Sequence, residues 1–148
     1  MKRQRFINVS WLLLFAILPV FLMQNSFSQT VIGLDNWYNH ETNAKTGKPF
    51  HYLWSDTEFS GYSRWGEIFT ARGAKITTVA RPDAKVLKKI NIYIIVDPDT
   101  TSESASPNYL NPEEIAVIKK WVQGGGVLAV FANDGITILD KFKADLPA

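Results

Sequence analysis

The apolar residues of the chain gather in four short runs, separated by longer polar segments. The most apolar run, Asn91–Val96 (NIYIIV), passes directly into an acidic Asp-Pro-Asp turn. The other three runs are Val31–Leu34, Lys75–Val79 and Val127–Ala132. Short runs rich in β-branched residues are typical of strands that are buried on both faces of a parallel sheet. The pattern therefore predicts a parallel sheet covered by helices.

Helical spacing occurs between these runs. A helix is predicted over Ser60–Arg72, where apolar residues recur at helical intervals and Gly73 supplies a left-handed C-terminal residue. Trp65 lies on the apolar stripe of this helix, so we expect its indole in the core. A shorter helical stretch is predicted over Pro82–Lys89.

A third helix has the clearest start and stop signals in the chain. Asn111 is a good N-cap, Pro112 occupies the first helical position, and Glu114 completes a capping-box pattern. Trp121 lies on the apolar stripe and is expected in the core. Gly124-Gly125-Gly126 ends the helix. These glycines lie between a helix and a strand, which is the opposite order to a phosphate-binding loop.

Strands and helices thus alternate, and right-handed crossovers place each helix over a parallel sheet. We predict an α/β fold of the three-layer, flavodoxin-like kind with strand order 2-1-3-4. Such a sheet normally has a fifth strand, so we expect the domain to be truncated after the fourth, leaving an apolar edge. The segment Thr137–Leu146 is expected to begin one more helix.

The first 28 residues have the pattern of a secretory signal peptide. Lys2, Arg3 and Arg5 precede an apolar stretch, Trp11–Met23, and small residues favour cleavage after Ser28. The apolar stretch is short for a membrane span. We therefore expect a signal peptide over residues 1–28, a domain over residues 29–148, no membrane association after cleavage, and a periplasmic or secreted location.

Removing the signal peptide changes the charge of the chain. The sequence has 16 Lys and Arg and 14 Asp and Glu, and three of the basic residues lie in the signal peptide. The rest has no basic excess for nucleic acid or an anionic membrane. The chain has no cysteine, which excludes disulfides, a thiol nucleophile and Cys-based metal sites.

Polar residues follow three of the four predicted strands, at the edge where ligands bind in open α/β sheets. The long polar and aromatic segment Asn36–Phe59 leads over the same edge, and long loops are often functional. The candidate ligand-binding residues are Asp35, Asn36, Trp37, His51, Tyr52, Trp54, Asp97, Asp99, Asn133 and Asp134.

Several chemistries fit this set. Carboxylates, amides and aromatic rings suit a carbohydrate site, and oxygen ligands suit Ca²⁺ or Mg²⁺. A hydrolase would use two carboxylates, for which Asp35, Asp97 and Asp99 are the candidates. Asp and Asn after strands also form turns and cap helices. His40 and His51 lack metal-ligand spacing, and no cofactor motif is present, so we expect no metal and no cofactor.

Five stretches together resemble one family. They are VIGLDNWYNHE (Val31–Glu41), HYLWSD (His51–Asp56) with SGYSRWGEIF after it, YIIVDPDT (Tyr93–Thr100), PNYL (Pro107–Leu110) and WVQGGGVLAVFAND (Trp121–Asp134). The chain is similar to the amidotransferase-like domain attached to unsaturated rhamnogalacturonyl hydrolases of glycoside hydrolase families 88 and 105. This resemblance implies a class I glutamine amidotransferase-like sheet and a periplasmic role in pectin degradation.

The resemblance does not make this chain the catalyst, because the hydrolase activity of those proteins belongs to a separate (α/α)₆ barrel. We therefore expect an accessory or non-catalytic domain that binds saccharide at the carboxyl ends of its strands. Its expected partners are a pectic oligosaccharide or a glycoside hydrolase domain. Two alternatives stay open: a carboxylate-dependent carbohydrate hydrolase, and an interaction domain that docks on a partner hydrolase.

Overall fold

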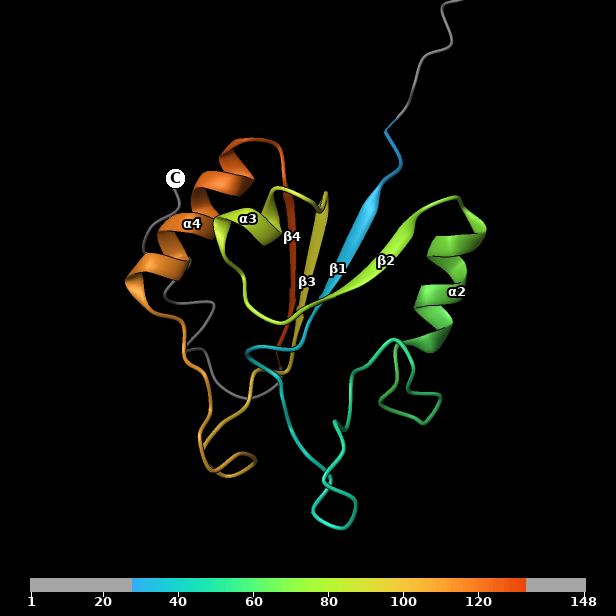
Figure 1. Cartoon of the computed structure of the whole chain (residues 1–148), viewed down its shortest axis with the longest axis vertical. Coiled ribbons are helices and arrows are strands. Elements are labelled where there is room, and N and C mark those ends of the chain that lie inside the picture. Colours follow the sequence, from blue (N-terminus) through green and yellow to red (C-terminus); the bar gives the residue numbers. More distant parts are fainter. Residues whose placement is uncertain (1–27, 133–148) are drawn as a thin grey trace, which may run out of the picture.

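A four-stranded, all-parallel sheet forms the centre of the computed structural model, which describes residues 28–132 (Figure 1). The strands lie in the order β2-β1-β3-β4, so β1 and β3 are central. This arrangement confirms the predicted α/β class, the parallel pairing and the strand order. The strands are β1 (Val31–Asp35), β2 (Lys75–Val79), β3 (Ile92–Val96) and β4 (Val127–Phe131).

Within residues 28–132, three helices cover the two faces of the sheet (Figure 1). Helix α2 (Ser63–Ala71) lies on one face, and α3 (Ala84–Leu87) and α4 (Pro112–Gln123) lie beside each other on the opposite face. Within residues 28–132, no helix combines the length and apolarity needed to cross a membrane. The predicted signal peptide, Asn133, Asp134 and the predicted helix Thr137–Leu146 lie outside the described residues.

The alternation of β3 distributes its side chains between two apolar clusters. Tyr93 and Ile95 belong to the cluster under α3 and α4, whereas Ile94 and Val96 belong to the cluster under α2. All four are buried because β3 has a strand on each side and helices on both faces. The uninterrupted apolar pattern of this strand follows from that position.

The start of α4 confirms one part of the sequence prediction and corrects another. Asn111 Oδ1 accepts a hydrogen bond from the Glu114 N–H at 2.9 Å, which is the predicted N-cap. The predicted capping box is wrong, because the Glu114 carboxylate does not return to Asn111. It accepts from the buried Tyr38 hydroxyl at 3.0 Å and lies 3.8 Å from the Arg81 guanidinium.

The expectation that Trp65 is a core residue is also wrong. Its side chain is 41% exposed, and Ile68 on the same helix is 48% exposed. The Trp65 ring reaches Phe131 of β4 edge-on, with ring centroids 5.6 Å apart. No other element of residues 28–132 covers β4 on this side, so the apolar stripe of α2 extends beyond its partner. Trp121, by contrast, packs against the core as predicted.

Candidate functional site

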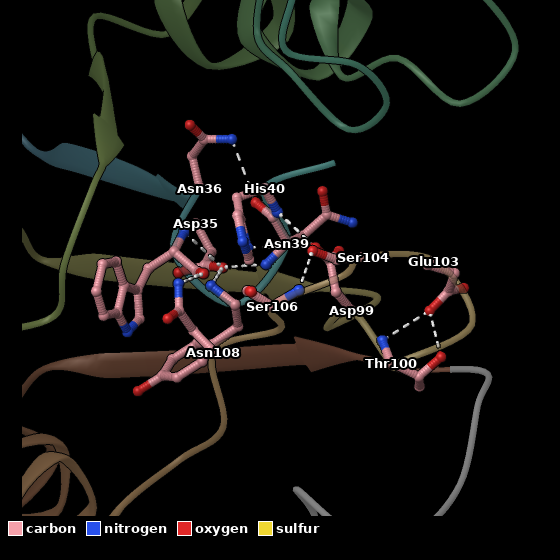
Figure 2. A network of polar contacts seen from close by, with 12 residues as sticks. Asp35, Asn36, Asn39, His40, Asp99, Thr100, Glu103, Ser104, Ser106 and Asn108 are labelled. Atoms are coloured by element: carbon pink, nitrogen blue, oxygen red, sulfur yellow. Dashed lines mark hydrogen bonds and ion pairs between the residues drawn. The ribbon is translucent and has the colours of Figure 1, made fainter. Parts of the chain in front are cut away.

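The loops after β1 and β3 are tied together at the carboxyl ends of the two strands. The Asn39 side-chain amide donates to the Asp97 carbonyl at 2.8 Å, and the Asp99 N–H donates to the Tyr38 carbonyl at 2.8 Å. Figure 2 shows the polar side chains of both loops converging there. The polar segments therefore meet at one edge of the sheet, as the sequence predicts.

Asp35 is a buried acceptor at the centre of this junction. Its Oδ2 atom accepts from the N–H groups of Trp37, Tyr38 and Asn39 at 2.8–3.2 Å, and its Oδ1 atom accepts from the Tyr93 hydroxyl. Burial raises the pKa of Asp35 to about 6, although these four hydrogen bonds oppose the rise. Both oxygens are thus occupied by the chain itself, and the residue holds the loop after β1.

Asp99 is likewise buried, beside the His40 imidazole. The His40 N–H donates to Asp99 Oδ2, and His40 Nδ1 lies 3.2 Å from the same oxygen. Burial raises the pKa of Asp99, while the His40 N–H and imidazole oppose the rise. Asp99 Oδ1 has no hydrogen-bond partner in the described part of the chain. The side chain of Asp99 links the two loops and is fully screened from solvent.

Three strained residues gather beside this junction. Among the non-glycine residues of 28–132, only His51, Tyr52 and Asp97 have positive φ angles, of 59°, 45° and 41°. A left-handed conformation costs an L-residue about 1–2 kcal/mol, and such residues cluster at functional sites. The Tyr52 hydroxyl donates to Asp97 Oδ2 at 2.8 Å. Burial, followed by this contact, raises the pKa of Tyr52 to about 12.

The Tyr52–Asp97 pair lines a pocket of about 350 Å³ at the carboxyl ends of β3 and β4. We call it the strand-end pocket, and its remaining walls are Tyr62, Val96, Phe131 and Ala132. Its volume lies within the range of small-molecule sites. Three aromatic rings and one carboxylate therefore face a single cavity.

His51 is anchored next to this pocket. Its Nδ1 atom lies 2.6 Å from Ser60 Oγ, which in turn lies 3.4 Å from Asp56 Oδ2. A nucleophilic triad has its carboxylate on the histidine, whereas here the carboxylate contacts the serine. These contacts connect the two ends of the segment before α2.

The two candidate tryptophans do not line the strand-end pocket. The Trp54 Nε1–H donates to the Thr77 carbonyl at 2.8 Å, which fixes the indole between α2 and β2. Trp37 packs on the opposite face, with the Arg81 guanidinium 5.3 Å from its ring centroid. The Asn36 side-chain amide donates to the Asn39 carbonyl at 3.2 Å. None of these three residues lines the strand-end pocket.

Besides Asp97, the acidic group of Glu41 lies within electrostatic range of Tyr52 in the strand-end pocket. Burial raises the pKa of Glu41, and the charges of Asp99, Glu103 and Asp97 raise it further, while His51 lowers it. Within the described ranges, no group of three or more His, Cys, Asp or Glu side chains is arranged to hold a metal ion. Asp97 and Glu41 therefore place negative charge at the pocket.

The pocket contains two aromatic residues that are absent from the predicted set, Tyr62 and Phe131. Both have a sequence signal, since Tyr62 stands directly before a helix and Phe131 ends an apolar strand. Of the predicted residues, Tyr52 and Asp97 line the pocket and His51 adjoins it, while Asp35, Asn36 and Asp99 hold the loops.

Fold and site together define a small parallel α/β domain with an aromatic and acidic pocket at the carboxyl edge of its sheet. Comparison of the chain with protein-family models gives no match, and no curated protein or solved structure matches it either. A functional assignment therefore depends on the geometry of the site and on the motifs of the sequence.

Proposed function

We propose that this protein is an exported, non-catalytic accessory domain of rhamnogalacturonan degradation, with a flavodoxin-like and amidotransferase-like fold, which binds saccharide in the strand-end pocket. The observation that carries the proposal is the strained Tyr52–Asp97 pair, held at 2.8 Å in a pocket with Tyr62 and Phe131. The resemblance of the sequence to domains attached to rhamnogalacturonyl hydrolases supplies the substrate class.

The chemistry of the pocket suits a sugar. Aromatic faces such as those of Tyr62 and Phe131 pack against the apolar C–H face of a pyranose ring. Asp97 Oδ2 is engaged by Tyr52, while Oδ1 has no hydrogen bond within residues 28–132. Asp97 Oδ1 can therefore accept a hydrogen bond from a ligand hydroxyl while Tyr52 fixes the orientation of the carboxylate.

The negative surroundings favour a neutral sugar unit. A uronate carboxylate placed in the pocket would approach Asp97, with Glu41 within electrostatic range of Tyr52. Two like charges about 4 Å apart repel each other by about 1 kcal/mol in water, and by more where solvent is excluded. The pocket therefore takes the neutral rhamnosyl unit of the polymer and leaves the uronate outside.

Binding is favoured over hydrolysis because only one candidate carboxylate faces the cavity. Asp97 lines the strand-end pocket, whereas Asp35 and Asp99 are buried and hold loops. A glycosidase of the usual kind needs two carboxyl groups on opposite sides of the scissile bond. The second candidate function is docking on a partner hydrolase, which the exposed Val127 and Phe131 of β4 favour.

The test is a titration of the purified protein with rhamnogalacturonan oligosaccharides and, separately, with oligogalacturonides. We expect the rhamnogalacturonan oligosaccharides to bind and to raise the melting temperature. At a ligand concentration of 100 times Kd, the free energy of unfolding should rise by about 2.7 kcal/mol. Asp97→Ala and Tyr62→Ala should abolish binding, while Glu67→Ala and Tyr109→Ala, which change exposed residues outside the pocket, should not.

Two results would contradict the proposal. Tighter binding of oligogalacturonide would exclude the neutral-sugar site, and unchanged binding in Asp97→Ala would exclude the strand-end pocket. Chromatography of the titrated oligosaccharide separates binding from hydrolysis, because a binding domain leaves its length unchanged.

A further inference from the structure

A second cavity lies at the opposite edge of the sheet, where the strands begin. It has a volume of about 580 Å³ and is bounded by α3, α4 and the glycine turn before β4. Figure 1 shows α3 and α4 beside each other on this face. We call this cavity the helix groove, and its lining residues are Ala84, Leu87, Lys88, Ile90, Asn91, Val117, Lys120, Trp121 and Gly124 to Gly126.

The walls of the helix groove are apolar and well supported. Leu87 and Ile90 are buried core residues, and Trp121 and Val117 pack against the same cluster. Gly126 lies against the Trp121 indole so closely that a Cβ atom there would come within 2.2 Å of the ring. The turn and the indole therefore form one wall of fixed shape.

The charged residues of the groove are lysines only. Lys88 and Lys120 line it, and Lys85, Lys89 and Lys119 lie on the same helical segments. None of the five forms an ion pair within the part of the chain that the structure describes. Their positions near helix C-termini are electrostatically favourable for cations. No carboxylate is among the lining residues.

The side-chain oxygen of Asn91, the remaining polar residue of the groove, is already engaged. Asn91 Oδ1 accepts from the Val31 N–H at 2.8 Å, which ties the starts of β1 and β3 together. A ligand in the groove would thus meet an apolar, partly aromatic wall and two ammonium groups. The volume of the helix groove falls within the range of small-molecule sites, and such sites combine apolar walls with a few polar groups.

We propose that the helix groove binds a small amphiphile with an apolar body and a single anionic head group. The body packs on Trp121, Leu87 and Val117, and the head group lies between Lys88 and Lys120. The site is independent of the strand-end pocket, because the two lie at opposite edges of the sheet and share no residue.

The test compares two fluorescent probes on the full chain: 8-anilinonaphthalene-1-sulfonate, which is anionic, and N-phenyl-1-naphthylamine, its neutral counterpart. Replacing Lys88 and Lys120 together by Gln should lower the affinity of the anionic probe by about fivefold and leave the neutral probe unchanged. Lys45→Gln with Lys48→Gln is the matched control, since these exposed lysines lie in the loop at the other edge.

A second pair of variants locates the apolar part of the site. Trp121→Phe should weaken both probes, whereas Trp65→Phe, on the opposite face, should weaken neither. Equal effects of the lysine variants on both probes, or an effect of Trp65→Phe alone, would overturn the proposal. Loss of probe binding as the protein dimerises at higher concentration would overturn it as well, because a second copy would then cover the groove.

Discussion

Tyr93 and Asp35, on the neighbouring central strands β3 and β1, are joined by a hydrogen bond from the phenol hydroxyl to the carboxylate in the interior of the domain. The same carboxylate holds the loop after β1 through three backbone N–H groups. Tyr38, in that loop, donates to Glu114 at the start of α4. A buried polar network therefore connects the sheet, the loop and the helix.

Removing the Tyr93 hydroxyl tests this network. Tyr93→Phe leaves one oxygen of Asp35 without its donor, and a buried unsatisfied acceptor costs about 1–3 kcal/mol. We expect a loss of stability in that range in urea unfolding at neutral pH. Tyr109→Phe, at an exposed tyrosine, is the control and should change stability very little. Equal stability of both variants would mean that the hydrogen bond adds nothing.

The pKa of Asp35 predicts a pH dependence of stability. Burial raises this pKa from 3.8 to about 6, so the folded chain holds the proton more tightly than the unfolded chain. The contribution of Asp35 to stability is therefore fully present below about pH 4 and is lost as the pH rises through about 6. Its full size is about 3 kcal/mol.

The variant Asp35→Asn isolates that contribution. Its amide keeps an oxygen for the backbone N–H groups and can donate to the Tyr93 hydroxyl, but it does not ionise. We expect the difference in unfolding free energy between the natural protein and Asp35→Asn to change between about pH 4 and 6, and to stay constant above that range. A difference that is flat across the whole range would exclude a raised pKa.

Because the backbone of Asp97 is left-handed, replacing this residue by Asn should cost less stability than replacing it by Val. Asn tolerates positive φ and can accept the Tyr52 hydrogen bond, so Asp97→Asn should cost less than about 1 kcal/mol. Asp97→Val should cost about 2 kcal/mol or more, because a β-branched residue is strained there and leaves Tyr52 without its acceptor. Chemical denaturation of both variants measures the order, which would be reversed if the backbone were extended.

The exposed edge of the sheet predicts a gain in solubility. Val127 on β4 is 53% exposed, and β4 has no neighbour on its outer side among the described residues. Val127→Lys should reduce light scattering of concentrated protein and change stability by less than about 0.5 kcal/mol. Tyr109→Lys, at an exposed position in a loop, should leave scattering unchanged. An equal reduction in both variants would point to net charge rather than to the edge.

The sequence predicts those parts of the fold that local signals control. The run Asn91–Val96 marks β3 because a fully buried strand needs apolar side chains on both faces. Asn111 marks the start of α4 because its side chain caps a backbone group three residues away. Glu114 follows the same pattern in the sequence, but the distant Tyr38 hydroxyl takes its carboxylate. The prediction that Trp65 is buried is wrong for a similar reason, because the burial of a helix residue depends on which element packs over it.

In the candidate site, too, some features follow from local sequence signals and others depend on distant parts of the chain. Strand ends place Asp97 at the correct edge of the sheet, and the aromatic loop supplies Tyr52. Their direct contact depends on positive φ angles at both residues, which no residue preference of Tyr or Asp specifies. Asp35 is still part of β1, so its alternation with the buried Leu34 directs its carboxylate to the face of Tyr93, whereas Asp97 follows the end of β3.

The three glycines of the turn between α4 and β4 differ in how well each would tolerate a side chain. Gly124 has a negative φ, and a Cβ atom there would lie 3.3 Å from the Trp121 carbonyl, so alanine fits with a small adjustment of the turn. Gly125 has a φ of 101°, which side chains rarely adopt, and Gly126 is pressed against an indole ring. Natural variation at this turn should therefore be least restricted at the first position, limited at the second by backbone conformation, and excluded at the third by the Trp121 ring.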